Sequence, residues 1–437
     1  MRLVIVLVFA AACSGTNGPP PPTATPPAAP AQNDPAFTVH GIRHWSLIPN
    51  ALTKGDPTMT IDVAAPAGTG YVDVWVGPQA GVRLDDQGNG HFAGTIDLAS
   101  LAPGATDVIL AADSSDAAFA KISFMRSHPL YVLMTTDYDF SDPADSSLTV
   151  MDSLHRLHPA LVMTHFASPY TFTDPAVTPE RAGVIAAWWR HARDDFHDEI
   201  GLHIHPYCNF VEAAGVTCNT MPSVEFANGD TTGYTVEVAS YSEADFLTLL
   251  HKADELFAAN QLGKPITFRA GAWTASIETL RALAADGFVA DTSALNWAKV
   301  EEWKNVGNKE LWTWNMTHWA PIDDTSQPYY PNHDDILASS PPPLSILEVP
   351  DNGAMVDYVS TAEMTTILSH NWDGTSALAE PTQLTVGFHP SKNYVGDVQS
   401  RTDGILTAVD QHAYFYDSGP CVYAVLKDMP KAFPPSP

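Results

Sequence analysis

Basic side chains are scarce in this sequence. Lys and Arg together number 21, against 50 Asp and Glu, which gives a formal net charge of −29 over 437 residues. A charge of this sign repels nucleic acid and anionic lipid, so we expect neither as a direct partner. A neutral or cationic substrate fits the composition better.

The apolar run near the start of the chain, Leu3–Phe9, is too short to span a bilayer as a stable helix. It follows Met1 and Arg2 and is followed by small residues that end at Cys13, the pattern of a signal peptide. The residues before Cys13 resemble the lipobox of bacterial lipoproteins, although the usual Leu is Ala10 here. We expect residues 1–13 to direct export and Cys13 to carry a lipid anchor to the cell envelope, at the outer membrane or the cell surface. Ordinary cleavage nearby, or a fortuitous apolar start, is the alternative.

Cysteine is also scarce, with four in the chain. If Cys13 is lipidated, three remain for an oxidising compartment. The close pair Cys208 and Cys218 is the predicted disulfide, and Cys421 is then left over as a possible competitor.

Composition and hydrophobic pattern divide the rest of the chain into three parts. Residues 14–35 are rich in Pro, Thr, Ala and Gly, which predicts an extended tether. Residues 36–126 carry short stretches in which apolar and polar residues alternate, broken by Gly, Pro and Asp. This pattern predicts a small all-β, immunoglobulin-like sandwich. The sandwich shows no catalytic cluster and reads as an accessory module.

From residue 127 to residue 437, apolar strand-like runs alternate with amphipathic helices, which predicts an α/β domain with a parallel sheet or barrel. Ser242 and Asp245 predict the capped start of one helix, and Gly287 predicts the end of another. The predicted strands are Tyr131–Thr136, Ala160–His165, Glu199–His205, Ile266–Ala270, Phe288–Ser293, Leu347–Pro350 and Leu384–His389.

Two of these strands end in paired metal-ligand side chains. Asp137 and Asp139 follow the first strand, and His203 and His205 close the third. Residues two apart on an extended strand project to the same face, so each pair can converge on one ion. Carboxylates and imidazoles suit Zn²⁺ or a similar divalent metal. Either pair alone is common turn chemistry or packing, but their joint occurrence at strand ends favours a metal site.

Three further strand ends carry polar groups: Arg269, Asp291 and His389. Individually each has an ordinary structural interpretation, as an ion pair, a turn residue and a core histidine. Together with the metal-ligand pairs, their order along the chain resembles the five motifs of the polysaccharide deacetylases, also called carbohydrate esterase family four. The resemblance covers roughly the last two-thirds of the chain.

The resemblance implies an irregular (β/α) barrel of the deacetylase type and a hydrolase that removes N-acetyl or O-acetyl groups from a polysaccharide. It implies a divalent ion, most often zinc with cobalt or nickel as alternatives, held by Asp139, His203 and His205. Asp137 is then the base that activates water, and His389 the acid that protonates the leaving group. Oxyanion stabilisation is implied for a backbone N–H near Tyr207.

The resemblance also gives Arg269 the role of orienting Asp137, and Asp291 that of pairing with His389. Two departures leave the division of roles between Asp137 and Asp139 open: Tyr138 separates the aspartates, which are adjacent in the family, and the histidines are two apart rather than four. Trp273 and Trp297 follow motif strands and are predicted to stack on sugar rings.

Two other functions remain open. A metal-dependent amidohydrolase also places His-X-His at a strand end, but usually on the first barrel strand, whereas an earlier strand carries Asp137 and Asp139 here. A non-catalytic surface glycan-binding protein would need neither the base nor the acid. The acetylated polysaccharide or oligosaccharide is therefore the predicted partner.

Overall fold

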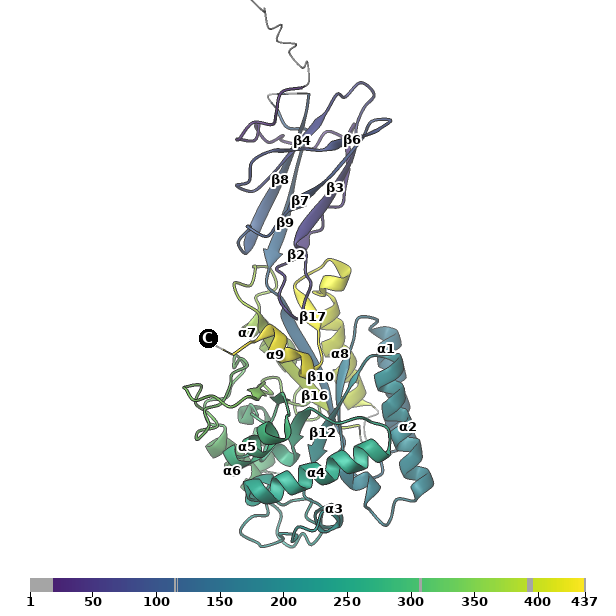
Figure 1. The fold of residues 1–437 in the computed structure, drawn as a ribbon, viewed down its shortest axis with the longest axis vertical. Coiled ribbons are helices and arrows are strands. Elements are labelled where there is room, and N and C mark those ends of the chain that lie inside the picture. The colour runs from purple at the N-terminus through teal and green to yellow at the C-terminus, as the bar shows by residue number, and fades with distance from the viewer. Residues whose placement is uncertain (1–18, 114, 116, 306–308, 391–395, 436–437) are drawn as a thin grey trace, which may run out of the picture. The chain divides into compact units, whose positions relative to one another are not determined.

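The computed structural model describes residues 19–435, apart from residues 114, 116, 306–308 and 391–395 (Figure 1). These residues form two compact units. The first comprises the chain up to Ile42 with Thr58–Leu101 and Thr106–Phe124, and the second comprises Arg43–Pro57, Ala102–Ala105 and the chain from Met125 onward. Cys13 and the predicted signal peptide lie outside the described residues.

The first unit is built of strands. One sheet has the order β1-β3-β7-β6 and is antiparallel throughout. A second sheet contains the order β9-β8-β4-β5. Alternate residues of β3 and of β4 enter one buried apolar cluster, which explains the alternating sequence pattern. The bounds are β1 (Thr38–His40), β3 (Thr58–Ala64), β4 (Val72–Val76), β5 (Val82–Arg83), β6 (Asp85–Gly88), β7 (His91–Asp97), β8 (Gly104–Ala112) and β9 (Ala120–Ser127). The immunoglobulin-like type of this arrangement stays a prediction.

The described part of the predicted tether is bonded to these strands. The Trp75 indole donates to the Thr23 carbonyl at 2.9 Å, and the Asp34 amide donates to the Phe119 carbonyl at 2.8 Å. Extended Pro-rich backbone has no internal hydrogen bonds, so its carbonyls are available to such donors. The predicted tether is therefore attached to the folded unit by hydrogen bonds at Thr23 and Asp34.

The second unit contains an eight-stranded parallel sheet with the order β15-β14-β13-β12-β11-β10-β16, and β17 also pairs with β10. Every residue of β10, β11 and β12 is buried, as expected for a parallel sheet covered on both faces. The bounds are β10 (Leu130–Asp137), β11 (Met163–Ala167), β12 (Glu199–Ile204), β13 (Thr267–Ala270), β14 (Ala290–Asp291), β15 (Leu347–Glu348), β16 (Thr382–Phe388) and β17 (Cys421–Tyr423). In the same unit, β2 (Trp45–Leu47) pairs in parallel with the last residues of β9.

The sheet curls into an irregular barrel. The chain that follows β15 reaches β16, where the Gly387 amide donates to the Ala354 carbonyl at 3.0 Å and the Val356 amide donates to the Gly387 carbonyl at 2.9 Å. This irregular segment, and not a regular strand, joins the two edges of the sheet. The mixed α/β class with a curled parallel sheet agrees with the prediction for residues 127–437.

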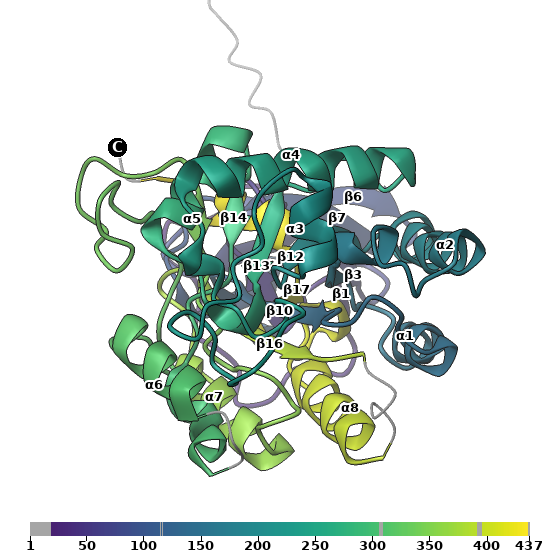
Figure 2. The same ribbon diagram turned by 90° about the horizontal axis from the view of Figure 1, so that it is seen from below.

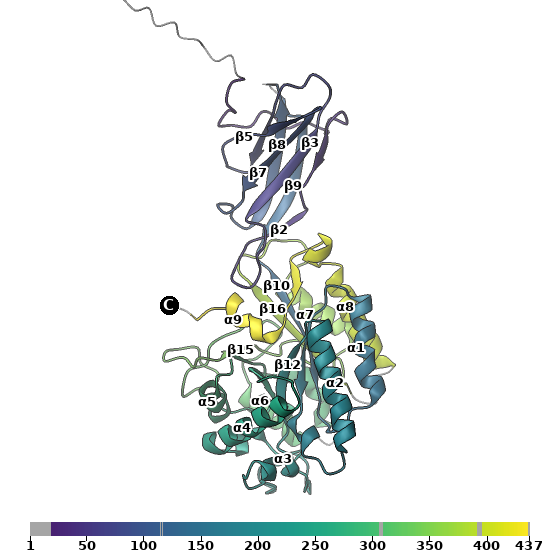
Figure 3. The same cartoon turned by 45° about the vertical axis from the view of Figure 1, so that its right-hand side comes forward.

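Helices surround the sheet in the view of Figure 2. Figures 1 and 3 both place α1 and α2 side by side along it, where His191 lies 3.6 Å from Asp152. The helices are α1 (Asp145–Leu157), α2 (Pro179–Asp195), α3 (Cys208–Ala213), α4 (Glu243–Ala259), α5 (Ile277–Asp286), α6 (Lys309–His318), α7 (Thr361–Asn371), α8 (Asp397–Asp410) and α9 (Met429–Ala432). Of the described helices, none is long and apolar enough to cross a membrane.

The two predicted helix boundaries are present. Ser242 caps α4 by accepting a hydrogen bond from the Asp245 amide. Gly287 ends α5 in the left-handed conformation, with a φ of 90°.

Candidate active site

The predicted site residues lie at the carboxyl ends of the parallel strands. Asp137 is the last residue of β10, His203 lies in β12, and Arg269 lies in β13. Asp139 and His389 follow the ends of β10 and β16. In parallel α/β sheets this edge is where loops converge and ligands bind. The fold therefore brings together residues that are far apart in the sequence.

Asp139, His203 and His205 form a cluster in which the potential ligand atoms all lie within 4.8 Å of one another. Oδ1 of Asp139 is 3.2 Å from Nε2 of His203 and 3.5 Å from Nε2 of His205. Both histidines are buried. One carboxylate and two imidazoles are a ligand set typical of catalytic zinc sites, which keep a further position open for water.

Main-chain carbonyls fix the orientation of both imidazoles. Nδ1 of His203 lies 2.9 Å from the carbonyl of Arg269, and Nδ1 of His205 lies 2.9 Å from the carbonyl of Tyr234. A carbonyl only accepts, so Nδ1 carries a proton, and Nε2 of each ring faces Asp139, where it can share a proton or an ion with the carboxylate. Nε2 of His205 is buried and has no hydrogen-bond partner, which an ion at this place would supply. The donor set therefore fits a divalent metal.

The carboxylate of Asp139 is kept ionised by its surroundings. Burial alone would raise its pKa, but His389, His203 and His205 outweigh this and hold the pKa of Asp139 well below its usual range. The Tyr234 hydroxyl donates to Oδ2 of the same carboxylate at 3.1 Å. Asp139 is thus an anion with defined partners on both oxygens.

Asp137 has a different environment. It is buried, and the Arg269 guanidinium donates to its Oδ1 at 3.0 Å. The same guanidinium lies 3.3 Å from Asp351, which accepts a hydrogen bond from the Trp273 indole at 2.9 Å. Burial raises the pKa of Asp351 to about 6, against the opposing charge of Arg269. Arg269 therefore contacts the carboxylate that the resemblance gives it to orient.

His389 is held by a carboxylate that the sequence analysis did not single out. Oδ2 of Asp357 lies 3.2 Å from Nδ1 of His389 and accepts from its main-chain amide at 3.1 Å. Nε2 of His389 lies 3.6 Å from Oδ2 of Asp139. Burial lowers the pKa of His389, but the charges of Asp139 and Asp357 prevail and raise it to about 10.

Asp291 does not reach His389. Its carboxylate accepts from the Ser293 hydroxyl at 2.9 Å and faces Glu348, both carboxyls being fully buried. The predicted pairing of Asp291 with His389 is therefore replaced by the Asp357 pairing. The physical reason is position, because the Asp291 carboxylate is turned toward Ser293 and Glu348, whereas Asp357 lies in the irregular segment that bonds to β16.

Two other predicted positions also differ from expectation. The Tyr207 amide donates to the His205 carbonyl at 2.7 Å, so this N–H is already used within a tight turn and is not free for an oxyanion. The Trp297 indole donates to the Ala320 carbonyl at 3.3 Å, its ring lies against Trp312, and it lines neither cavity of the site. Trp273, by contrast, does line the site.

Two cavities meet at the cluster, and Asp137, Asp139 and His389 line both of them. The larger one has a volume of about 520 Å³ and is also lined by Phe140, Asp142 and Arg181. The smaller one, of about 120 Å³, is lined by the cluster and also by aromatic and apolar side chains. They include Phe226, Tyr234, Trp273, Trp303, Leu311 and Tyr358.

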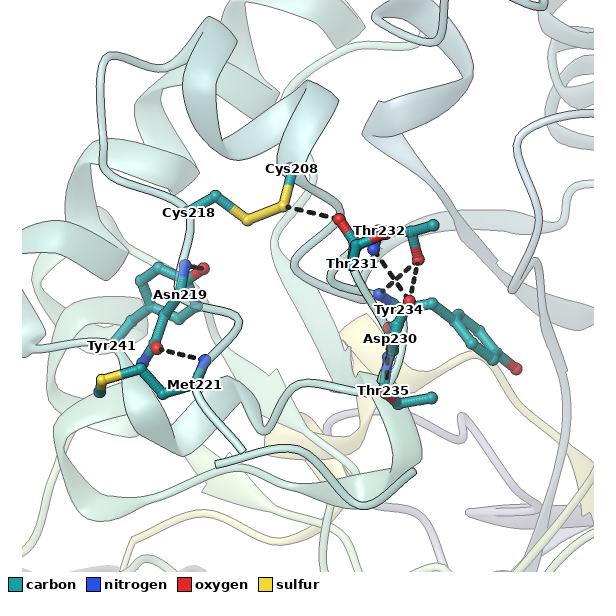
Figure 4. The surroundings of a disulfide bond; sticks show 10 residues. All are labelled: Cys208, Cys218, Asn219, Met221, Asp230, Thr231, Thr232, Tyr234, Thr235 and Tyr241. Atoms are coloured by element: carbon teal, nitrogen blue, oxygen red, sulfur yellow. Dashed lines mark hydrogen bonds between the residues drawn. A yellow bond between two sulfur atoms is a disulfide. The ribbon is translucent and has the colours of Figure 1, made fainter. Parts of the chain in front are cut away.

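Part of the smaller cavity is formed by a loop beside the disulfide, where the Cys208 amide donates to the Thr232 carbonyl at 2.7 Å. Cys208 and Cys218 are bonded, as Figure 4 shows, and the loop that follows carries Tyr234. Asp230 accepts hydrogen bonds from the amides of Thr232 and Thr235, at 2.9 and 2.7 Å. These hydrogen bonds on both sides of Tyr234 stabilise the loop conformation that places its side chain at the site. Cys421 is a buried free cysteine.

The sequence analysis missed several residues of this site: Tyr234, Asp351, Asp357 and Tyr358. Asp351 directly follows the predicted strand Leu347–Pro350, so the strand-end rule applied to the other ligands would have found it. Asp357 and Tyr234 lie in irregular segments with no pattern that marks them.

Comparison with known proteins gives structural neighbours only. No family model and no curated protein matches the chain. Solved structures that resemble it include a family 4 carbohydrate esterase from Streptomyces lividans, with 10% identity, 70% of this chain and 96% of that chain covered, and a TM-score of 0.35. A family 4 acetyl xylan esterase from Clostridium thermocellum, in complex with cobalt, has 12% identity, 69% and 90% coverage and a TM-score of 0.33.

A family 4 pseudoenzyme from Bacillus anthracis is also similar, with 9% identity, coverage of 68% of this chain and 64% of that chain, and a TM-score of 0.33. These neighbours are of the family that the order of the motifs resembles. Their TM-scores are too low to assign an activity, so the function below is inferred from the geometry of the site.

Proposed function

We propose that this protein is a metal-dependent hydrolase that removes acetyl groups from an extracellular carbohydrate. One observation carries the proposal. Asp137 and His389 line the same cavity as the metal-ligand cluster of Asp139, His203 and His205. A binding protein would need the cluster at most. A hydrolase needs a proton acceptor and a proton donor beside it.

The side chains of this site have separate tasks. Asp139, His203 and His205 would hold a divalent ion, most favourably zinc, through one carboxylate oxygen and two Nε2 atoms. When bound, such an ion lowers the pKa of a coordinated water to about 7 and polarises a carbonyl. Asp137, anchored by Arg269, accepts the proton of the attacking water. His389, held at Nδ1 by Asp357, carries a proton at Nε2 for the departing amine or alkoxide.

The smaller cavity suits the acetyl group, because aromatic and apolar side chains lie there beside the metal ligands, and the larger one leaves room for the sugar. Acetate release from acetylated oligosaccharides, measured on chelated protein before and after zinc is restored, tests the proposal. We expect release only with metal. Metal binding without acetate release from any acetylated glycan would favour the non-catalytic binding protein.

We also propose that the protein is exported and anchored to the cell envelope by a lipid on Cys13. The signal-like residues before Cys13 support this, and a disulfide between Cys208 and Cys218 is in keeping with an oxidising compartment. Metabolic labelling with a palmitate analogue tests it. Label on the wild-type protein and its loss in Cys13→Ala are expected, and label retained in the variant would contradict the anchor.

A further inference from the structure

Phe140 is an exposed aromatic side chain beside the candidate metal site. It directly follows Asp139, and 53% of its surface is exposed, whereas Tyr138 on the other side of Asp139 is 2% exposed. A single exposed ring is ordinary on a protein surface, so the place of Phe140 in a cavity, and not its exposure alone, points to a ligand. Phe140 lines the larger cavity together with Asp137, Asp139 and His389.

One face of the Phe140 ring packs against Tyr234. The ring stacks on Tyr234, with centroids 5.6 Å apart and planes at 25°. Tyr234 is itself fixed at three points, since its hydroxyl donates to Asp139, its carbonyl accepts from His205, and its ring lies 4.5 Å from the His205 ring. Figure 4 shows Tyr234 on the loop that Asp230 holds beside the disulfide. The support is therefore rigid, and the outer face of Phe140 is left for contact.

The charges of this cavity decide what the ring can bind. Arg181 lines the cavity, but its guanidinium is already occupied by Asp142, Asp145 and the Pro143 carbonyl. Arg181 is thus not free to bind an anionic sugar, and the other cation that lines the cavity, His389, already faces Asp139 and Asp357. A neutral sugar ring, with apolar C–H faces and hydroxyl edges, fits an aromatic plate bordered by carboxylates.

We propose that Phe140 is the stacking platform that positions a neutral pyranose ring of the substrate for reaction. This inference rests on the proposed function, which supplies the acyl group at the metal. Phe140 would bind the sugar through its outer face while Tyr234 holds the inner face against the metal ligands. Because the platform adjoins Asp139 in the sequence, the sugar ring and the scissile acyl group are placed by one continuous segment.

The first experiment compares two substrates on the zinc-loaded enzyme. Phe140→Ala should lower kcat/KM for acetylated neutral oligosaccharides about tenfold more than for 4-nitrophenyl acetate, which has no pyranose ring. Phe140→Trp should restore the oligosaccharide rate, since it restores a stacking face. Phe415→Ala is the matched control, because Phe415 is 64% exposed and lies outside both cavities. An equal effect of Phe140→Ala on both substrates would overturn the platform.

A second experiment separates this inference from the proposed function. In the Asp137→Asn background, calorimetry measures oligosaccharide binding without turnover. We expect Phe140→Ala to weaken Kd about tenfold with zinc content unchanged. If binding depends on Phe140 but the wild-type enzyme releases no acetate, the platform stands and the proposed activity fails. If acetate is released but Kd is the same with and without Phe140, the activity stands and the platform is wrong.

Discussion

At the scale of single residues, the two aspartates that follow β10 have different partners. Asp139 faces the two histidines, and Asp137 faces Arg269. This geometry favours Asp139 as the ligand and Asp137 as the base, a division that the sequence left open. The inserted Tyr138 makes it possible, because its own side chain turns into the core and leaves the flanking carboxylates toward the site.

The division of roles predicts opposite effects of two conservative changes. Asp137→Asn keeps the shape but removes the proton acceptor, so turnover should fall by about 10²- to 10⁴-fold while zinc stays bound. Asp139→Asn should mainly weaken zinc binding. Zinc affinity and turnover at saturating metal, measured side by side on both variants, check this. Zinc lost from Asp137→Asn and retained by Asp139→Asn would reverse the roles.

The carboxylate that holds His389 gives a second prediction at this scale. Asp357→Asn weakens the contact that orients Nδ1 of His389, and turnover should fall by about 10- to 100-fold with zinc affinity little changed. Asp291→Asn is the comparison, because Asp291 contacts Ser293 and Glu348 instead. Steady-state rates on both folded variants decide between them. A larger loss of turnover in Asp291→Asn would restore the pairing that the family resemblance implied.

At the scale of elements, the sequence predicted the strands of the sheet well where buried apolar runs end in polar residues. β10 and β12 match their predicted ranges closely, since hydrophobic patterning and the polar strand ends coincide there. β11 begins at Met163, three residues after the predicted start at Ala160. β14 and β15 are two residues long, and such short strands depend on neighbouring strands more than on their own residues.

The irregular segments were beyond prediction for a physical reason. Asp357 and Tyr234 are placed by turns, cross-chain hydrogen bonds and a disulfide, none of which leaves a periodic pattern in the residues. The sequence therefore predicted the ligands on strands and missed the side chains that support them from loops. The pairing of Cys208 with Cys218 rested on closeness in sequence, and the structure joins these two residues.

The disulfide loop gives a prediction at the element scale. Replacing Cys208 and Cys218 together by Ser loosens Cys208, whose amide donates to Thr232 in the loop that carries Tyr234, so zinc affinity should weaken about tenfold. The free energy of unfolding should fall by about 2–3 kcal/mol, because the bond closes a short loop in the unfolded chain. Metal titration and denaturant unfolding measure the two effects. Cys421→Ala is the control, and equal zinc affinity in all three proteins would show that the loop does not support the site.

A buried pair of carboxyls links β14 and β15 and predicts a pH effect on stability. Burial and the neighbouring Asp291 raise the pKa of Glu348 well above its usual value. A raised pKa in the folded state means that this stability is present below the unfolded pKa and is lost as pH rises through the folded pKa. Glu348→Gln removes that titration and still offers a donor to Asp291.

We therefore expect the free energy of unfolding to fall less steeply with rising pH in Glu348→Gln than in the wild type, above a pH of about 5. For one proton the two slopes can differ by at most about 1.4 kcal/mol per pH unit. Urea unfolding at a series of pH values measures the difference. Parallel curves for the two proteins would mean that no proton is held between these carboxyls.

At the scale of the whole molecule, the net charge of −29 affects the product more than the substrate. Removal of an N-acetyl group exposes an amine that is cationic at neutral pH, which the anionic enzyme attracts. We expect inhibition by added deacetylated oligosaccharide to weaken as salt rises from about 0.05 to 0.5 M, because salt screens this attraction. Removal of an O-acetyl group leaves a neutral hydroxyl and predicts no such dependence. Inhibition that strengthens with salt would contradict the electrostatic account.

The pairing of β10 with β16 also sets the order in which the site is completed. β10 leads to the two aspartates of the site, and β16 leads to His389. The two strands are far apart in the sequence but pair residue by residue, Leu130–Thr136 with Thr382–Phe388. Such long-range pairing forms late, because the intervening chain must be ordered first. The ligands of β10 and β12 can meet before β16 joins the sheet, whereas the acid arrives only with β16. A folding chain is therefore expected to gain the ability to capture an ion before it gains the ability to cleave.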